Sequence, residues 1–443
     1  MAQPVIAIFD IGKTNKKFFL FDEQFQEINE EYIKIPLIQD EDGEECDDLV
    51  KLTDWVREKV QIICESEEYV LKALNFSTYG ASLVHINEDG EPVAPIYNYL
   101  KDFPEDLHEE FYGKYSEAAI NLTTASPTLG MLNSGLLIYW LKRKRPDVFN
   151  QIKYSLHLPQ YVSYLFTGEA VSEPTSIGCH TKLWDFAKSD YHEWVYEEGI
   201  DSLLPEIVPT THYFEKEICG QKVKVGVGIH DSSSALASYL VKVKEPFLLI
   251  STGTWSISLN PYPEENLDFS DLQNDCLNFL SIHGKMVKAS RFLLGYELDH
   301  QLLQLNRIFN KPEKYYKTIV PDEMIIGQIE QRRIENSFYP ATIAKTPLVN
   351  EVFPESNWHP ESFSSYEEAY HQVIWGLTRM QVASLKLAQG SAPIKKVFID
   401  GGFVHNQVFI RLLQHFLDGY TLEFSDFPLG SAYGAALMLD EST

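Results

Sequence analysis

Two segments of the chain, far apart in the sequence, share one uncommon pattern: an apolar run, a turn rich in glycine and threonine, and a second β-rich run. The first copy spans Val5 to Phe21, with the turn Gly12-Lys13-Thr14-Asn15. The second spans Phe247 to Leu259, with the turn Ser251-Thr252-Gly253-Thr254. Apolar runs joined by such turns are typical of antiparallel strands. The repeat therefore predicts two domains with the same fold.

The boundary between these domains is expected at a charged stretch that ends in proline, Val241-Lys242-Val243-Lys244-Glu245-Pro246. We place it so that the domains comprise residues 1–243 and 244–443. Each then has about 200 residues, an ordinary size for a domain. The stretch from Asn260 to Pro360 has weak periodicity, and the sequence gives no clear prediction for it.

Further elements indicate the fold class. After the first two strands come a third, Tyr32 to Ile38, a helix with apolar residues at helical spacing from Leu49 to Ile63, and a strand, Val70 to Phe76. Three meander strands, a helix and another strand begin the ribonuclease-H-like layer of actin-type ATPases, in which helices cover a mixed sheet. We therefore expect an α/β protein with two actin-like (ribonuclease-H-like) domains and a ligand cleft between them.

The second half of the chain ends in a clear pattern. Ser365 with Glu368 is a capping-box signature and opens a predicted helix through Leu387. A strand, Lys396 to Ile399, and the turn Asp400-Gly401-Gly402 follow. The rest alternates in the same way, with a helix over 406–417, a strand over 421–424 and a small-residue helix over 431–439.

The charge of the chain limits its partners. It has 37 Lys and Arg against 64 Asp and Glu, a net charge of −27. Such a surface repels nucleic-acid phosphates and anionic lipid headgroups, so we expect neither partner. The cationic run Lys142-Arg143-Lys144-Arg145 follows apolar residues and precedes Pro146, as expected of the last turn of a helix.

The chain shows no sign of export. Met1-Ala2-Gln3-Pro4 carries no positive charge before a short apolar run, and no apolar window approaches the roughly 18 residues of a membrane span. The five cysteines are scattered and lack a Cys-x-x-Cys pair, which argues against a disulfide framework and a thiolate zinc site. We expect a cytoplasmic protein with reduced thiols.

The glycine turns indicate anion binding. Gly12-Lys13-Thr14 is no Walker A loop, because Ala7 stands where that motif requires glycine. The segment from Gly226 to Asp231 is no dinucleotide fingerprint, because Asp231 holds the third glycine position. A hairpin turn nevertheless presents backbone N–H groups that favour anions. The two repeated turns are therefore expected to bind one polyphosphate.

Four motifs, in order, resemble those of the FGGY carbohydrate kinases. Ile8 to Lys17 is similar to the first phosphate motif of that family, and Gly228 to Ala235 to the segment that carries the catalytic aspartate. Ile250 to Ser256 is similar to the second phosphate motif, and Asp400 to Asn406 to the adenosine motif. One such motif alone is a weak signal, whereas four in the family's order are specific. The pair His230-Asp231 is especially similar to the L-fuculose and L-rhamnulose kinase branch.

The resemblance implies an ATP-dependent sugar kinase that uses Mg²⁺ and phosphorylates a terminal hydroxyl of a ketose. A 6-deoxyketohexose such as L-fuculose or L-rhamnulose is favoured. Asp231 would be the general base, and Asp10 and Asp231 would hold the metal. The phosphate-binding residues implied are Gly12, Lys13, Thr14, Asn15, Lys17, Gly253 and Thr254. Those implied for adenosine are Gly401, Gly402 and Asn406, and those for the sugar are Gly80, Ala81, His230 and Asp231.

The sequence also leaves alternatives open. Lys13 departs from the family, which usually has Thr or Ala there, so it either replaces a lost phosphate contact or obstructs the site. The segment from Ile96 to Lys101 departs from the Tyr-Arg-Asp-x-Arg pattern of relatives, and this leaves the sugar contacts open. Asp231 alone would fit a helix cap, and Asp10 a turn. Two further classes remain, a nucleotide-binding interaction protein of the actin or chaperone type and a sugar-binding pseudokinase. A homodimer also stays open.

Overall fold

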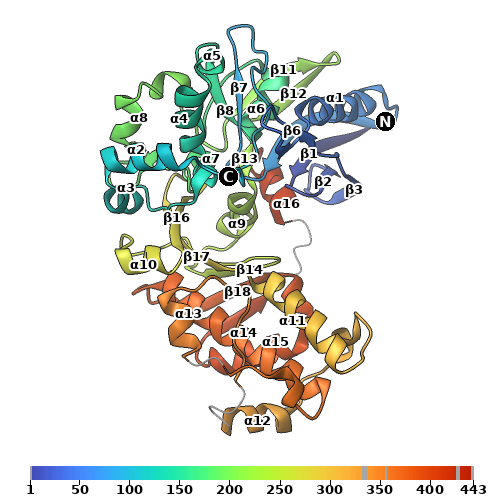
Figure 1. Cartoon of the computed structure of the whole chain (residues 1–443). Coiled ribbons are helices and arrows are strands. Elements are labelled where there is room, and N and C mark those ends of the chain that lie inside the picture. The colour runs from blue at the N-terminus through green and yellow to red at the C-terminus, as the bar shows by residue number, and fades with distance from the viewer. Residues whose placement is uncertain (1, 332–336, 355–356, 426–429, 441–443) are drawn as a thin grey trace. The chain divides into compact units, whose positions relative to one another are not determined.

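The computed structural model describes residues 2–331, 337–354, 357–425 and 430–440, and it divides into two compact units (Figure 1). The first unit contains the chain up to Lys244, together with Asn278–Met286 and the C-terminal segment that carries helix α16 (Gly430–Leu437). The second unit is the rest of the chain. The sequence predicted that each domain would be one continuous stretch of chain. It did not indicate that these two later segments belong to the first unit.

The sheet of the first unit has the strand order β11-β12-β6-β1-β2-β3, with β13 also paired to β6. The strands β1, β2 and β3 form an antiparallel meander, whereas β6 runs parallel to β1 on one side and to β12 and β13 on the other. Their bounds are β1 (Gln3–Ile11), β2 (Lys16–Phe21), β3 (Glu27–Ile33), β6 (Tyr69–Thr78), β11 (Tyr213–Ile218), β12 (Gln221–Gly226) and β13 (Ile229–His230). The predicted meander and parallel strand are confirmed.

The position of the third strand is a correction. It was predicted at Tyr32 to Ile38, but β3 begins at Glu27 and ends at Ile33. Its residues Glu30 and Glu31 lie opposite Phe19 and Phe18 of β2. The strand is rich in glutamate because it lies at the edge of the sheet and is partly exposed, so apolar patterning did not reveal its start.

Helices pack against both faces of this sheet. On one face α1 (Leu49–Glu65), capped by Asp48 at the N–H of Lys51, buries its predicted apolar stripe, and Trp55 meets Phe9 edge-on. A second cluster joins residues of β1 and β2 with small side chains of α9 (Asp231–Lys242) and α16. Small residues let α9 and α16 pack closely, and Asn75 of β6 donates a hydrogen bond to the carbonyl of Ala435.

The remaining elements of the first unit are short. The strands are β4 (Ile38–Gln39), β5 (Glu45–Cys46), β7 (Leu83–Ile86), β8 (Tyr154–His157), β9 (Trp184–Asp185) and β10 (Asp190–Tyr191). The helices are α2 (Glu105–Tyr115), α3 (Glu117–Thr123), α4 (Ser134–Lys144), α5 (Pro146–Phe149), α6 (Leu158–Thr167), α7 (Pro174–Ile177) and α8 (Glu193–Glu197).

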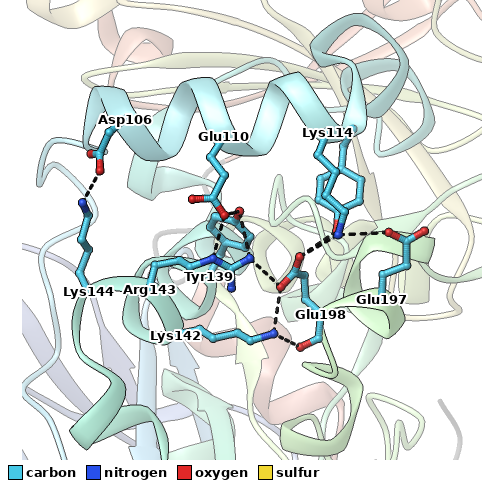
Figure 2. Close-up of polar contacts among 10 residues, drawn as sticks. Asp106, Glu110, Lys114, Tyr139, Lys142, Arg143, Lys144, Glu197 and Glu198 are labelled. Carbon is cyan, nitrogen blue, oxygen red and sulfur yellow. Dashed lines mark hydrogen bonds and ion pairs between the residues drawn. The ribbon is translucent and has the colours of Figure 1, made fainter.

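The cationic run lies where the sequence predicted it, in the last turn of α4. Figure 2 shows that its side chains turn to carboxylates of the same unit. Glu198, which follows α8, lies 2.9 Å from the Lys142 ammonium and 3.0 Å from the Arg143 guanidinium, and it also accepts a hydrogen bond from Lys114 of α2. Lys144 pairs with Asp106. The run is therefore a structural ion-pair network.

The second unit repeats the first. Its sheet has the order β16-β17-β15-β14-β18-β19, in which β14, β15 and β17 are antiparallel neighbours and β18 runs parallel to β14. This is the arrangement of β1, β2, β3 and β6, so the predicted repeat is confirmed. The bounds are β14 (Leu248–Thr252), β15 (Ser256–Asn260), β16 (Cys276–Leu280), β17 (Met286–Phe292), β18 (Lys396–Gly401) and β19 (Thr421–Phe424).

The long helix α14 (Tyr366–Gln389) packs against this sheet and against α15 (Gln407–Phe416) (Figure 1). Its predicted start is confirmed, because the Ser365 hydroxyl accepts a hydrogen bond from the N–H of Glu368. In the stretch from Asn260 to Pro360, which has weak periodicity, the chain forms α10 (Phe269–Gln273), α11 (Leu294–Ile308), α12 (Glu323–Gln331) and α13 (Pro347–Val352). In the described ranges, every helix is too short or too polar to cross a membrane.

The network at Glu198 gives a stability prediction. Burial opposes ionisation of Glu198, but hydrogen bonds from Lys142, Lys114, Tyr115 and Arg143 outweigh it and lower its pKa to about 2. The carboxylate therefore stabilises the fold above pH 4.5, and this contribution is lost as the pH falls toward 2. We expect Glu198→Gln to lower stability at pH 7 by about 1–3 kcal/mol, measured by urea unfolding with tryptophan fluorescence.

The matched control is Glu197→Gln, because that neighbouring side chain is 53% exposed and lies 3.4 Å from Lys114. We expect it to change stability by less than about 0.5 kcal/mol. The deficit of Glu198→Gln should shrink when the pH is lowered to about 3. Equal losses in the two variants, or a deficit independent of pH, would contradict this assignment.

Candidate functional site

The carboxyl end of β6 brings three segments of the first unit together. On one side Asp10 of β1 lies opposite Ser77, and on the other side His230 of β13 lies opposite Thr78. Asp231 follows directly and begins α9. Ligands of α/β sheets bind outside the carboxyl ends of parallel strands. The residues predicted as base and metal ligand therefore lie at the edge where a ligand is expected.

The charge of Asp231 acts on the carboxyl group of Asp10. Burial, followed by the charge of Asp231, raises the pKa of Asp10 to about 6, against smaller opposing effects of Ser431 and Lys17. Lys17 is the cross-strand partner of Asp10 on β2, and its ammonium lies 5.1 Å from the ring centre of Tyr32. The site thus holds more negative charge than its cations neutralise.

The two carboxylates can be compared with the ligands that Mg²⁺ requires. Among the residues that the structure describes, no three His, Cys, Asp or Glu side chains form a metal-binding group. Mg²⁺ does not require one, because it is commonly held by one or two carboxylates together with substrate phosphates and water. A divalent cation beside Asp10 would favour its ionised form, which burial and the charge of Asp231 oppose. The two aspartates are therefore compatible with the predicted metal role.

Asp231 is oriented by its neighbours. Its Oδ1 lies 3.2 Å from Nε2 of His230 and accepts a hydrogen bond of 2.6 Å from the N–H of Ser232. The N-cap residue of α9 is His230, and no side chain caps this helix. The Asp231 side chain is 34% exposed. It is thus fixed on one oxygen and open to solvent, as a proton acceptor for a bound ligand would be.

The predicted sugar residues surround His230. A Cβ atom on Gly80 would lie 2.9 Å from Cδ2 and Nε2 of the imidazole, so only glycine lets the ring approach this loop. Ala81 has a φ of 58°, in the left-handed region. Burial lowers the pKa of His230, although the charges of Asp231 and Glu173 oppose this. The imidazole is therefore neutral at pH 7, and its Nδ1 lies 3.3 Å from the Ser233 hydroxyl.

The first glycine turn is closed by a hydrogen bond from the N–H of Gly12 to the carbonyl of Asn15, and Thr14 and Asn15 are exposed. Lys13, which is predicted to contact the phosphates, turns its side chain to a carboxylate of the same unit. Its ammonium is 2.6 Å from a carboxylate oxygen of Asp47, a residue that the sequence did not single out. The other oxygen of Asp47 lies 3.1 Å from the ammonium of Lys16, which is buried.

In the loop from Ile96 to Lys101, the cation also pairs with carboxylates of the same unit. The Lys101 ammonium lies 2.8 Å from Asp40 and 2.9 Å from Asp42, within the acidic loop that follows β4. This cation is therefore used to order that loop.

The second unit contains a pocket of about 700 Å³, a size common for small-molecule sites. It brings together residues that the sequence assigned to phosphate and to adenosine, namely Gly253, Thr254, Gly402 and Asn406. Phe403 and His405 belong to the predicted adenosine motif, whereas the sequence did not find the other lining residues, Gly295, Leu298, Asp299, Tyr316, Lys317, Ile319, Tyr370 and Gln407. Most of them come from the region with weak periodicity or from helix ends.

Close packing of β14 on β18 shapes this pocket. The Thr252 hydroxyl donates to the carbonyl of Asp400 and accepts from the N–H of Phe403. Gly401 has a φ of +89°, and a Cβ atom there would lie 1.9 Å from the carbonyl oxygen of Thr252. Asn406 caps α15 at the N–H of Phe409 and donates to the hydroxyl of Tyr370. The predicted adenosine residues therefore build the pocket wall, with Gly401 beneath it.

Comparison with solved structures identifies the class of fold. The chain is similar over its whole length to a carbohydrate kinase from Novosphingobium aromaticivorans, with a TM-score of 0.81, 21% identity and 92% of that chain covered. A xylulose kinase from Lactobacillus acidophilus gives a TM-score of 0.79, with 15% identity, 99% of this chain and 89% of that one. The predicted two-domain, actin-like fold is confirmed.

The family is equally clear. The model of the N-terminal domain of the FGGY family of carbohydrate kinases matches residues 5–235, and the model of the FGGY C-terminal domain matches residues 244–443. The chain belongs to the FGGY family of carbohydrate kinases, as the four motifs indicated.

Curated relatives are more distant. A rhamnulokinase of Halalkalibacterium halodurans is 24% identical over 213 residues, which cover 42% of this chain and 41% of the relative. A rhamnulokinase of Klebsiella pneumoniae is 25% identical over 236 residues, 51% of this chain and 47% of the relative. The match therefore spans less than half the length of these relatives.

The raised pKa of Asp10 predicts an effect of pH on stability. Because its pKa is raised from 3.8 to about 6, the folded state binds a proton that the unfolded state releases, and stability falls as the pH rises from 4 to 6. Asp10→Asn removes this loss. We expect the variant, in metal-free buffer with EDTA, to be more stable than the wild type at pH 7.5 by about 1–2 kcal/mol and equally stable at pH 4.

Urea unfolding at the two pH values measures this difference. The control is Asp54→Asn, which removes an exposed carboxylate from α1 of the same unit. A gain that is the same at both pH values, or present in the control as well, would show that ionisation of the buried Asp10 is not its cause.

Proposed function

We propose that this protein is an ATP-dependent kinase that phosphorylates a terminal hydroxyl of a ketose. The observation that carries the proposal is the meeting of Asp10, His230 and Asp231 at the end of β6, beside the loop of Gly80 and Ala81. A carboxylate that is half-exposed and held by a neutral histidine is suited to accept a proton from a sugar hydroxyl.

In the proposed reaction the hydroxyl oxygen of the sugar attacks the γ-phosphorus of ATP. A bond forms between that oxygen and phosphorus, the bond from phosphorus to the bridging oxygen breaks, and ADP leaves. Asp231 takes the hydroxyl proton, and the neutral imidazole of His230 keeps the carboxylate oriented. Asp10 and Asp231 would hold Mg²⁺, which when bound neutralises phosphate charge.

The donor is assigned to the pocket of the second unit. Its volume and its glycine-rich wall suit a nucleotide, and the Lys317 side chain adds a cation to a pocket that also contains Asp299. Gly253 and Thr254 would meet the phosphates, and Gly402 and Asn406 the adenosine. In the first unit, Gly12, Thr14, Asn15 and Lys17 are assigned to the phosphates as well, because the turn exposes Thr14 and Asn15 and Lys17 adds a cation on β2.

The acceptor we favour is a 6-deoxyketohexose, L-rhamnulose or L-fuculose. Support comes from the adjacent His230 and Asp231 and from relatives that are named rhamnulokinase. The similarity to structural neighbours named xylulose kinase and gluconate kinase concerns the fold alone. A nucleotide-binding interaction protein has no need of a histidine-oriented aspartate at the sheet edge, and a pseudokinase would bind sugar without forming product.

The central variant is Asp231→Asn. We expect its kcat to fall by about 100-fold or more, because a general base is lost, while ATP binding and thermal stability are kept. A coupled ADP-release assay over a panel of ketoses, with calorimetry for ATP, measures both quantities. Asp201→Asn is the control, since Asp201 also begins a helix of the first unit without capping it and should retain wild-type turnover.

Two results would refute the proposal in different ways. If the wild type releases ADP at a rate that no ketose changes, the protein is not a ketose kinase. If ketoses stimulate the wild type and Asp231→Asn stays within a few-fold of it, the sugar kinase stands and Asp231 is not its base.

A further inference from the structure

Lys13 stands at the tip of the first glycine turn, yet one buried carboxylate fixes both its side chain and its backbone. The Lys13 ammonium lies 2.6 Å from Oδ2 of Asp47. Oδ1 of Asp47 lies 3.1 Å from the ammonium of Lys16, which in turn donates a hydrogen bond of 2.9 Å to the carbonyl of Lys13. Because Asp47 is 4% exposed, water competes little for these contacts. The turn therefore has a defined orientation.

Two tyrosines place the Lys13 ammonium beside the predicted sugar loop. It lies 5.2 Å from the ring centre of Tyr79 and 5.1 Å from that of Tyr99. The Tyr79 hydroxyl donates to the same oxygen of Asp47 at 2.8 Å, and Tyr79 directly precedes Gly80 and Ala81. Burial raises the pKa of Tyr99, and the charges of Asp231 and Asp47 raise it further.

The charges of this cluster leave Lys13 available to a ligand. Burial disfavours the ionised form of Asp47, but the hydrogen bond and charge of Lys13, with the charge of Lys16, outweigh it and lower the pKa of Asp47. Two ammonium groups thus share one carboxylate. Lys16 is buried by this pairing, whereas the Lys13 side chain is 23% exposed. An ammonium has three donors, so Lys13 keeps donors beyond the one that Asp47 accepts.

We propose that Lys13 is a specificity-determining residue for the sugar acceptor, and that Asp47 is the positioning residue that holds it toward that substrate. The inference rests on the proposed function. A remaining N–H donor of Lys13 bonds a hydroxyl or carbonyl oxygen of the ketose, and the half-buried ring of Tyr99 offers an apolar surface to its C–H groups. Lys13 is thus assigned to the acceptor and not to the phosphates of ATP.

A second observation agrees with this assignment. Lys101 is the one cation in the sequence from Ile96 to Lys101, and Asp40 and Asp42 bind it within the acidic loop. Lys101 is thus engaged within that loop. Lys13 is the cation that the structure places against Tyr79 and Tyr99.

The test compares the KM for the ketose with the KM for ATP, using the ketose of the panel that the wild type turns over fastest. In Lys13→Met the stem is kept and the charge is removed, while Asp47 retains Lys16 and Tyr79 as partners. We expect the KM for the ketose to rise about 10-fold or more, as for a lost hydrogen bond to a charged group, and the KM for ATP to stay within about 2-fold.

Asp47→Asn should change the two constants in the same direction, because Lys13 loses the anion that orients it. If that buried substitution prevents folding, as thermal unfolding would reveal, Lys13→Met decides alone. Lys51→Met, on the exposed face of α1, is the control and should leave both constants unchanged.

The outcomes separate this inference from the proposed function. If no ketose stimulates the wild type, the proposed function fails and the inference falls with it. If the wild type is a ketose kinase and Lys13→Met raises the KM for ATP but not that for the ketose, Lys13 is a phosphate ligand and the inference alone is wrong. Unchanged constants in Lys13→Met would likewise overturn it.

Discussion

The parallel pairing of β6 with β1 and β13 is the constraint on which the proposed acceptor site depends. Its register fixes Asp10 beside Ser77 and His230 beside Thr78, so that two carboxylates converge at one edge of the sheet. This convergence depends on long-range pairing and not on local sequence, because well over a hundred residues separate β6 from β13. Burial at this edge, followed by the charge of Asp231, raises the pKa of Asp10.

The second unit contains the same parallel pairing, but different groups lie at the ends of its strands. There β14 lies parallel to β18, and Gly401 approaches Thr252 so closely that no side chain fits between the strands. At the corresponding edge, the hydroxyl of Thr252 and the backbone of Gly401 lie next to the pocket. One repeated topology thus provides an acidic edge suited to an acceptor hydroxyl and a glycine-rich edge suited to a nucleotide.

Much of this could be predicted from local sequence signals. Glycine turns, apolar periodicity and the cap at Ser365 depend on neighbouring residues, and the structure confirms the strands and helices that they indicated, except for the position of β3. Asp47 and Tyr99 were missed because their importance arises from contacts with Lys13, far away in the sequence. The roles of the site residues, the cytoplasmic location and a homodimer stay predictions.

The account assigns the acceptor to the end of β6 and the nucleotide to the pocket of the second unit. Hydrogen exchange with mass spectrometry tests this most directly, with a ketose and a non-hydrolysable ATP analogue added separately. The account predicts that the analogue protects the amides of residues 253–254 and 402–407, and that the ketose protects those of 79–82 and 230–233. Protection of the second set by the analogue alone, with none at the pocket, would contradict it.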